Sequence, residues 1–547
     1  MTERILIPSI FCGGEKNIAS TETLDSLRFP LPDVSSWLTD DPGEITARQE
    51  VFRDLLNDPL LEETFVDAKT KLNALADLMR KAGGFLPKDS ETALYALREL
   101  SIFTDAVTGL AMGGNVRSER LGAFFNAVKA IAHDPDFIAL RDWLNTLADS
   151  LRNIRSLTIG VNLDAQLSAT EAGIVSINSK PFMAGNFVER GLRKEAVSDG
   201  YSLLGVIGIR ESGTFLGPDK LAIDRAFYSA MNEIVRGSLR NLHRRIMSDC
   251  AEVMRSLIER AEEIGHLLSC TALLHRMKEA KLPMTFPEAG KSTKLLQLYC
   301  VTLADKLPVT RIVPSDVQIT DEKRIFILTG PNAGGKTVYC TALGIAQLLY
   351  QLGLPVPARS AVMRTFSRIA VHFTRDVSGS TESRLANEAT RLREALDGAN
   401  SDTLLLLDET FSSTSAFDAL YLAEALIDWL LSAGCRTLYS THLHELTSKY
   451  GSGAVPGVGC LSAKVEDGRR TYEIVPHTNE DPSTSLAKDI AVENGLGFLF
   501  GDRQEGVEND VFGSLPDDSL LDGLEKEDAL QRTPGPQACV HPDRRES

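Results

Sequence analysis

The chain has 547 residues, of which 43% are hydrophobic, and a formal net charge of −17 at pH 7. This length suggests three or four domains, and the lack of an apolar run near ~18 residues argues against a membrane-spanning helix. Such an acidic balance is unusual for a nucleic-acid-binding protein, so any contact with DNA must come from a local basic patch.

The start of the chain and its cysteines indicate a cytoplasmic protein. The N-terminus lacks the charged start, apolar core and small-residue cleavage site of a signal peptide. The eight cysteines are scattered and form no C-x-x-C pair, which suits reduced thiols. We therefore predict a cytoplasmic location and no membrane contact.

A helical region follows an N-terminal segment of residues 1–44. Apolar residues recur at helical spacing from 45 to 156, and turn signals separate the runs. The turn signals are Asn57-Asp58-Pro59, Gly83-Gly84 and Asp134-Pro135. This pattern predicts successive helices.

A small β-containing insert interrupts the helices at about 157–217, where short β-like runs and spaced glycines occur. A long helical pattern resumes at Leu221 and continues through Leu257. Residues 45–290 are therefore predicted to form a helical core and lever domain that carries the insert.

The candidate basic patches lie in this lever domain. Arg236, Arg240 and Arg244 recur at four-residue steps and so share a helix face. The insert offers a comparable set, Lys180, Arg190, Arg193 and Lys194. Either set could contact DNA phosphates, but a solvated lever surface or a set of ion pairs explains the same pattern and is more common.

The strongest motif is a phosphate-binding loop of the form G-x-x-x-x-G-K-[ST]. Its residues are Gly330, Pro331, Asn332, Ala333, Gly334, Gly335, Lys336 and Thr337. A β-like run, 324–329, precedes the loop and a helical pattern from Tyr339 to Leu352 follows it, which is the context the motif requires. We expect Lys336 to reach the β- and γ-phosphates of ATP and Thr337 to ligate Mg²⁺.

A Walker B motif lies about seventy residues further on. Four consecutive leucines, Leu404–Leu407, precede Asp408 and Glu409, as in a parallel strand buried on both faces. Asp408 is expected to hold Mg²⁺ and Glu409 to orient and deprotonate the attacking water. A lone pair of acids at a strand end would be unremarkable, but its position after a phosphate loop favours catalysis.

A third segment, Ser440-Thr441-His442-Leu443-His444, follows an apolar strand at 436–439, and a helix from Asp418 to Leu431 precedes that strand. His442 could donate to the γ-phosphate, as a switch histidine does in ATP-binding-cassette folds. A metal pair of His442 and His444 is disfavoured, because residues two apart on a strand face opposite ways.

The C-terminal part contains a hairpin and an acidic tail. Residues 461–475, broken by Asp467-Gly468, predict a hairpin, and 485–494 a closing helix. Residues 501–547 hold twelve acids against five Lys and Arg and show no sustained periodicity, so we predict disorder.

Together these motifs resemble the ATPase domain of the MutS mismatch-repair family. The match comprises the phosphate loop, the segment Gln351–Ala358, the Asp408-Glu409 pair with Thr414, Ser415 and Asp418, and the segment Thr441–Leu446. Residues 46–51 and 55–59 more weakly resemble the start of that family's helical core. The resemblance implies an α/β fold with a P-loop ATPase domain of the ATP-binding-cassette type at 291–500.

The resemblance also implies composite sites in a homodimer. Where the family has Gly-Arg-Gly-Thr, this chain has Phe411-Ser412-Ser413-Thr414, so its signature loop is altered. We expect Ser412, Ser413, Thr414 and Ser415 to contact the partner's nucleotide. Fewer than fifty residues precede the core-like segment, so the family's mismatch-recognition and connector domains are expected to be absent.

The sequence therefore predicts a DNA-binding ATPase, a dimeric clamp acting in mismatch repair or a related process, without selectivity for mispairs. The alternatives are an ATPase of the same class whose levers bind a protein or another nucleic acid, and a nucleotide-dependent scaffold that does not hydrolyse ATP.

Overall fold

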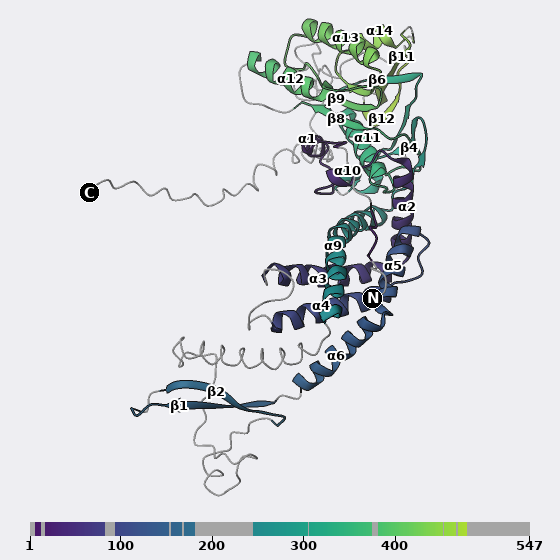
Figure 1. Cartoon of the computed structure of the whole chain (residues 1–547). Helices are drawn as coiled ribbons and strands as arrows, with labels where there is room; N and C mark the ends of the chain where they lie inside the picture. Colours follow the sequence, from purple (N-terminus) through teal and green to yellow (C-terminus); the bar gives the residue numbers. More distant parts are fainter. Residues whose placement is uncertain are drawn as a thin grey trace, which may run out of the picture. The chain divides into compact units, whose positions relative to one another are not determined.

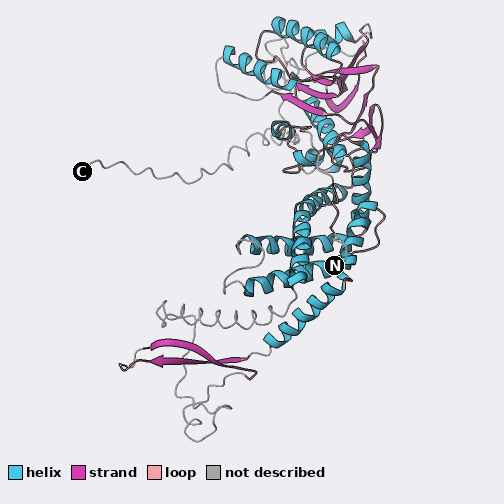
Figure 2. Ribbon diagram, in the orientation of Figure 1, coloured by secondary structure: helices cyan, strands magenta, loops and turns pink. Residues whose placement is uncertain are grey.

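The computed structural model describes most of the chain up to residue 478 (Figures 1 and 2). The described residues are 6–11, 17–81, 93–152, 155–166, 169–180, 244–304, 306–374, 381–451, 453, 455–466 and 469–478. All of them lie within one unit, residues 1–485. The predicted closing helix and acidic tail lie outside the described residues.

The helical region contains six helices among the described residues. They are α2 (Pro42–Asn57), α3 (Pro59–Lys81), α4 (Ala93–Ala111), α5 (Glu119–Ala132), α6 (Pro135–Arg152) and α9 (Arg244–Glu279). The turn signals at Asn57-Asp58-Pro59 and Asp134-Pro135 fall between helices, as predicted. The Gly83-Gly84 signal and residues 181–243 are not among those described.

Side-chain caps fix where these helices begin. Asp41 accepts a hydrogen bond from the Gly43 N–H at 2.8 Å and Pro42 occupies the first turn of α2. Ser118 caps α5 by accepting from the Leu121 N–H. Each cap satisfies an amide that has no partner inside its own helix, so the short polar residues in the sequence set the helix starts.

The predicted insert begins with an antiparallel hairpin. Strands β1 (Ser156–Leu163) and β2 (Ala169–Asn178) pair directly, and the Ser176 hydroxyl donates to Thr158 across the pair at 2.9 Å. The predicted β-runs are therefore confirmed, and the remainder of the insert lies in the undescribed segment 181–243.

Two sheets run through the described residues between Glu288 and Pro476, and with the helices they confirm the α/β class. The larger sheet has the order β12-β11-β6-β10-β9-β8, in which only β12 is antiparallel to its neighbour. Its strands are β6 (Lys323–Thr329), β8 (Arg368–Phe373), β9 (Thr403–Asp408), β10 (Arg436–Ser440), β11 (Gly457–Glu466) and β12 (Arg469–Pro476). The smaller sheet contains β3 (Glu288–Ala289), β4 (Thr293–Leu298), β5 (Ser315–Ile319) and β7 (Ser360–Met363).

Helices cover both faces of the larger sheet (Figure 2). Helix α11 (Lys336–Gln351) packs on one face, while α13 (Ala416–Ala433) and α14 (His444–Tyr450) pack on the other. Strand β9 alternates accordingly, with Leu404 and Leu406 in the α11 core and Leu405 and Leu407 in the α13 core. Burial on both faces explains the uninterrupted run of leucines.

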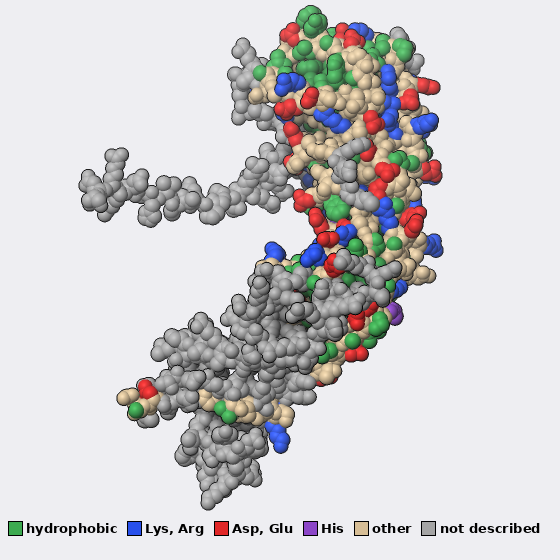
Figure 3. Space-filling view, in the orientation of Figure 1, with side chains coloured by type: hydrophobic (Ala, Val, Ile, Leu, Met, Phe, Trp, Pro, Cys, Tyr) green, Lys and Arg blue, Asp and Glu red, His purple; other side chains and the backbone are tan. Residues whose placement is uncertain are grey.

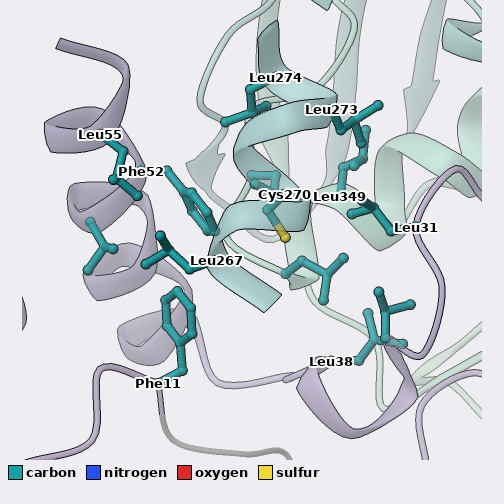
Figure 4. Packing of buried hydrophobic residues seen from close by; sticks show 14 of the residues in the cluster. Phe11, Leu31, Leu38, Phe52, Leu55, Leu267, Cys270, Leu273, Leu274 and Leu349 are labelled. Carbon is teal, nitrogen blue, oxygen red and sulfur yellow. The ribbon is translucent and has the colours of Figure 1, made fainter. Parts of the chain in front are cut away.

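One hydrophobic core joins the helical region to the sheet region. Phe52 of α2, Leu267 and Cys270 of α9 and Leu349 of α11 belong to the same buried cluster, together with Phe11 (Figure 4). All are at most 3% exposed. The helix that starts at the phosphate loop is therefore packed directly into the core that holds α9.

The N-terminal segment belongs to the sheet region as well. Ala19 forms a parallel bridge with Ile369 of the edge strand β8, and the Ile18 carbonyl accepts the Ile369 N–H at 2.8 Å. Helix α1 (Thr21–Ser26) follows, and Leu27, the residue after this helix, packs against Gly344 of α11.

No helix among the described residues has the length and apolar character needed to cross a membrane.

We predict that Leu267→Ala lowers the free energy of unfolding by ~2–5 kcal/mol, because it leaves a cavity in the shared core. Leu60→Ala is the matched control, since Leu60 is 70% exposed on α3 and its change should cost under ~0.5 kcal/mol. Denaturant unfolding of both variants measures the difference. Equal losses would contradict the shared core.

Candidate active site

The phosphate loop has the strand, loop and helix context that its motif requires. Strand β6 ends at Thr329 and α11 begins at Lys336. Gly330 and Gly335 have φ values of 147° and 91°, a region that favours glycine. A Cβ at Gly330 would lie 2.6 Å from the Ala463 Cβ, so the loop passes too close to β11 for any larger residue.

The start of α11 is suited to an anion. Its N-cap is Gly335, so no capping side chain occupies the N–H groups of the first turn. The N–H groups there and the positive end of the helix dipole are therefore available to a phosphate.

Lys336 is folded back over its own loop. Its ammonium group donates to the carbonyls of Gly330 at 3.0 Å and Pro331 at 3.1 Å, and the residue is 4% exposed. Burial lowers the pKa of Lys336, and the negative charges of Glu409 and Asp408 oppose that shift. A cation is thus held next to two carboxylates.

Asp408 ends β9 with one oxygen bonded and the other unsatisfied. The Thr337 hydroxyl donates to Oδ2 at 2.7 Å, whereas Oδ1 is buried without a hydrogen-bond partner. Burial raises the pKa of Asp408, and the nearby Ser440 and Thr337 hydroxyls oppose the rise. A buried carboxylate oxygen without a partner is costly, and a divalent cation would satisfy it.

A cation here would need further ligands from a bound molecule. Within the part of the chain that the structure describes, no group of three or more His, Cys, Asp or Glu side chains could hold a metal ion. Mg²⁺ commonly takes one or two protein ligands and completes its shell with phosphate oxygens and water. Thr337 and Asp408 fit that pattern.

Glu409 pairs with His442. The Nε2 atom of His442 lies 2.6 Å from Oε1 of Glu409, and the two side chains are 38% and 34% exposed. The hydrogen bond from His442 lowers the pKa of Glu409, and burial opposes this effect. The carboxylate is therefore ionised at neutral pH. His442, which is predicted to donate to a γ-phosphate, contacts the predicted base.

Parallel strand pairing brings these groups together. Ser440 of β10 lies in register with Leu328 of β6 on one side and with Asp408 of β9 on the other. The three strands therefore end at the same edge, where the phosphate loop, the two acids and His442 follow them. His444 begins α14, and burial lowers its pKa.

The Ser412–Ser415 segment lies between this edge and α13. Ser412 and Ser415 are exposed, and Ser415 caps α13 by accepting from the Asp418 N–H at 3.2 Å. Two aromatic residues follow on α13, Phe417 and Tyr421, which are 81% and 71% exposed. Apolar side chains gather over this end of the molecule (Figure 3).

Most of the basic residues predicted to contact DNA lie outside the described residues. Arg236 and Arg240 lie outside the described residues, as do Arg190, Arg193 and Lys194, and Arg244 is the first residue of α9. Lys180 is exposed just beyond β2.

Two residues near the site were missed by sequence reasoning. Glu388 of α12 (Thr381–Leu396) is buried and contacts the loop after Glu409. Tyr472 of β12 has its side chain and carbonyl within 4 Å of where a Cβ at Gly335 would be. Neither lies in a recognisable motif, so no local signal could have identified them.

The comparisons with known proteins agree with this geometry. Residues 326–484 match the family model of MutS domain V. A DNA mismatch repair protein MutS of an Exiguobacterium species is 38% identical over 146 residues, which is 26% of this chain and 17% of the relative. One of Prochlorococcus marinus is 32% identical over 211 residues, which is 37% of this chain and 23% of the relative.

The matched segment contains the phosphate loop, both Walker B acids and His442, and it is similar to MutS domain V. Over this segment the chain is similar to proteins of the MutS family. The chain spans about a fifth of the length of these curated relatives.

We predict that Gly330→Ala lowers the free energy of unfolding by ~1–3 kcal/mol, because the added methyl group meets Ala463 and the backbone is strained. Gly122→Ala is the matched control. No atom lies within 4 Å of a Cβ at that position, so the change should not destabilise α5. Thermal unfolding compares the two, and an unaffected Gly330→Ala protein would contradict the close approach of the loop to β11.

Proposed function

We propose that this chain is a MutS-like ATPase that hydrolyses Mg²⁺-bound ATP and that ATP binding and hydrolysis change its affinity for DNA. One observation carries the ATPase part: Thr337 is bonded to Asp408, whose second oxygen has no partner, beside Lys336 and Glu409. The relatives named DNA mismatch repair protein MutS support the DNA part.

The residues divide the chemistry as phosphoryl transfer requires. Lys336 and the N–H groups at the start of α11 would bind the β- and γ-phosphates, while Thr337 and Asp408 would hold Mg²⁺. Mg²⁺ supplies charge neutralisation when bound. Glu409 would orient the attacking water and accept its proton, and His442 is placed to hold Glu409 or to donate to the γ-phosphate.

The arrangement suits an ATPase of the ATP-binding-cassette type that works as a homodimer. In this proposal Ser412, Ser413, Thr414 and Ser415 of one chain complete the ATP site of the other. The exposure of Ser412 and Ser415 and of the neighbouring Phe417 and Tyr421 supports an interface here. Serine hydroxyls and the N-terminus of α13 can donate to a γ-phosphate.

We predict that Lys336→Ala weakens ATP binding, whereas Glu409→Gln binds ATP and hydrolyses it ~10² times more slowly or worse. Nucleotide binding and phosphate release measure the two steps separately. Lys323→Ala and Glu322→Gln are the matched controls, because both side chains are exposed at the other end of β6. Wild-type turnover in Glu409→Gln would remove that residue from the role of base.

DNA contact in this proposal is mainly electrostatic. Mismatch recognition by an aromatic wedge needs an exposed aromatic residue that can enter the duplex. Among the described residues before 280, the exposed large apolar side chains are Leu6, Leu60, Val66, Met112 and Val175, and none is aromatic. The lever and insert would contact phosphates, which position a protein on DNA without reading its sequence.

We predict that DNA binding falls steeply between about 50 and 200 mM salt and that a single mismatch improves it less than about tenfold. A titration of matched, mismatched and branched duplexes, with and without ATP, measures both. A larger mismatch preference would contradict a mainly electrostatic contact with DNA. If the protein binds no DNA at low salt with ATP present, the alternative is favoured in which the lever domain binds a protein.

A further inference from the structure

The backbone after the Walker B strand is strained at two residues. Glu409 and Phe411 have φ values of 53° and 70°, in the left-handed region that favours glycine. A bulky residue rarely adopts this conformation, which persists only where the surroundings hold it. Phe411 is 7% exposed, with its ring in the α13 core, so its side chain is fixed on one side.

Glu388 holds the other side of this turn. Its carboxylate accepts the Phe411 N–H at 2.6 Å through Oε1 and the Ser413 hydroxyl through Oε2. Glu388 is 5% exposed on α12, so both bonds form away from water, where a hydrogen bond is electrostatically stronger. One side chain therefore ties down both ends of the segment Phe411–Ser413.

Glu409 itself is held by other groups. Its N–H donates to the Ser440 carbonyl at 2.9 Å, and its carbonyl accepts the Thr374 hydroxyl at 3.1 Å. Its carboxylate is bonded to His442. The Glu409 carbonyl also accepts the Ser412 N–H at 3.2 Å, which keeps a turn at the start of the loop. Loss of Glu388 would therefore leave the predicted base in place and remove the two bonds that fix the Phe411 N–H and the Ser413 hydroxyl.

We propose that Glu388 is a positioning residue that sets the conformation of the Ser412–Ser415 loop for the ATP site of the partner chain. This inference rests on the proposed function, in which that loop completes the partner's site. The hydrogen bonds of the Glu388 carboxylate go to the loop after Glu409 and not to the phosphate loop, so its contribution should appear in turnover and not in ATP binding.

Three variants test the role of the carboxylate in steady-state hydrolysis. Glu388→Ala removes both acceptors and should lower kcat at least ~10-fold, with ATP affinity within about twofold of wild type. Glu388→Gln keeps an oxygen for the Phe411 N–H and offers its amide to Ser413, so kcat should stay within about threefold. Glu394→Ala, an exposed glutamate on the same helix, should match wild type.

Mixed dimers show on which chain Glu388 acts. Glu388→Ala chains have an intact phosphate loop, and Lys336→Ala chains have an intact signature loop. Mixing them should restore about one working site per mixed dimer, although each variant alone turns ATP over slowly or not at all. No recovery on mixing would show that Glu388 serves its own chain and would overturn the inference.

Amide hydrogen exchange tests the positioning without any turnover. Exchange of the Phe411 N–H should be faster in Glu388→Ala and near wild type in Glu388→Gln. Unchanged exchange in a folded Glu388→Ala protein would overturn the inference. If that variant does not fold, Ser413→Ala removes one of the two bonds and should speed exchange to a lesser degree, while no change would count against the role.

The two proposals can fail separately. A wild-type protein that hydrolyses no ATP would refute the proposed function, and the exchange measurement would still decide whether Glu388 positions the loop. Normal turnover in Glu388→Ala beside an inactive Glu409→Gln would refute only the role of Glu388.

Discussion

Parallel pairing of β6, β10 and β9 is the constraint on which the site depends. Parallel strands end at one edge of a sheet, so residues far apart in sequence meet there. The phosphate loop follows β6, Asp408 and Glu409 end or follow β9, and His442 follows β10. The contacts between Thr337 and Asp408 and between Glu409 and His442 are consequences of this register.

The same sheet connects the site to the helical region through α11. This helix starts at Lys336, and near its end Leu349 enters the core that also holds Phe52 and Leu267 (Figure 4). The Gln351 amide donates to the carbonyls of Thr39 at 3.0 Å and Phe366 at 2.9 Å. Helix α11, which would receive the phosphates at its start, is thus hydrogen-bonded at its end to the segment that leads into α2. A shift of α11 on nucleotide binding would therefore act directly on the helical region.

Local patterns made much of this predictable from sequence. The phosphate loop, the leucine run before Asp408 and the turn signals around Asp58 and Pro135 each depend on neighbouring residues, and the structure contains the predicted elements. Contacts made through the tertiary fold were not predictable. Glu388 is one of three glutamates on an amphipathic helix, and the bridge of Ala19 to β8 leaves no periodic signal. The partner of His442 depends on side-chain orientation, which spacing does not encode.

Binding of Mn²⁺ in place of Mg²⁺, followed by electron paramagnetic resonance, tests most directly whether this edge of the sheet is a metal–nucleotide site. We predict that Mn²⁺ binds tightly only with ATP present, shows coupling to phosphorus, and is lost in Asp408→Asn but retained in Glu322→Gln. Equal binding of Mn²⁺ with and without ATP, or binding that Asp408→Asn leaves unchanged, would contradict the assignment of Thr337 and Asp408 to that site.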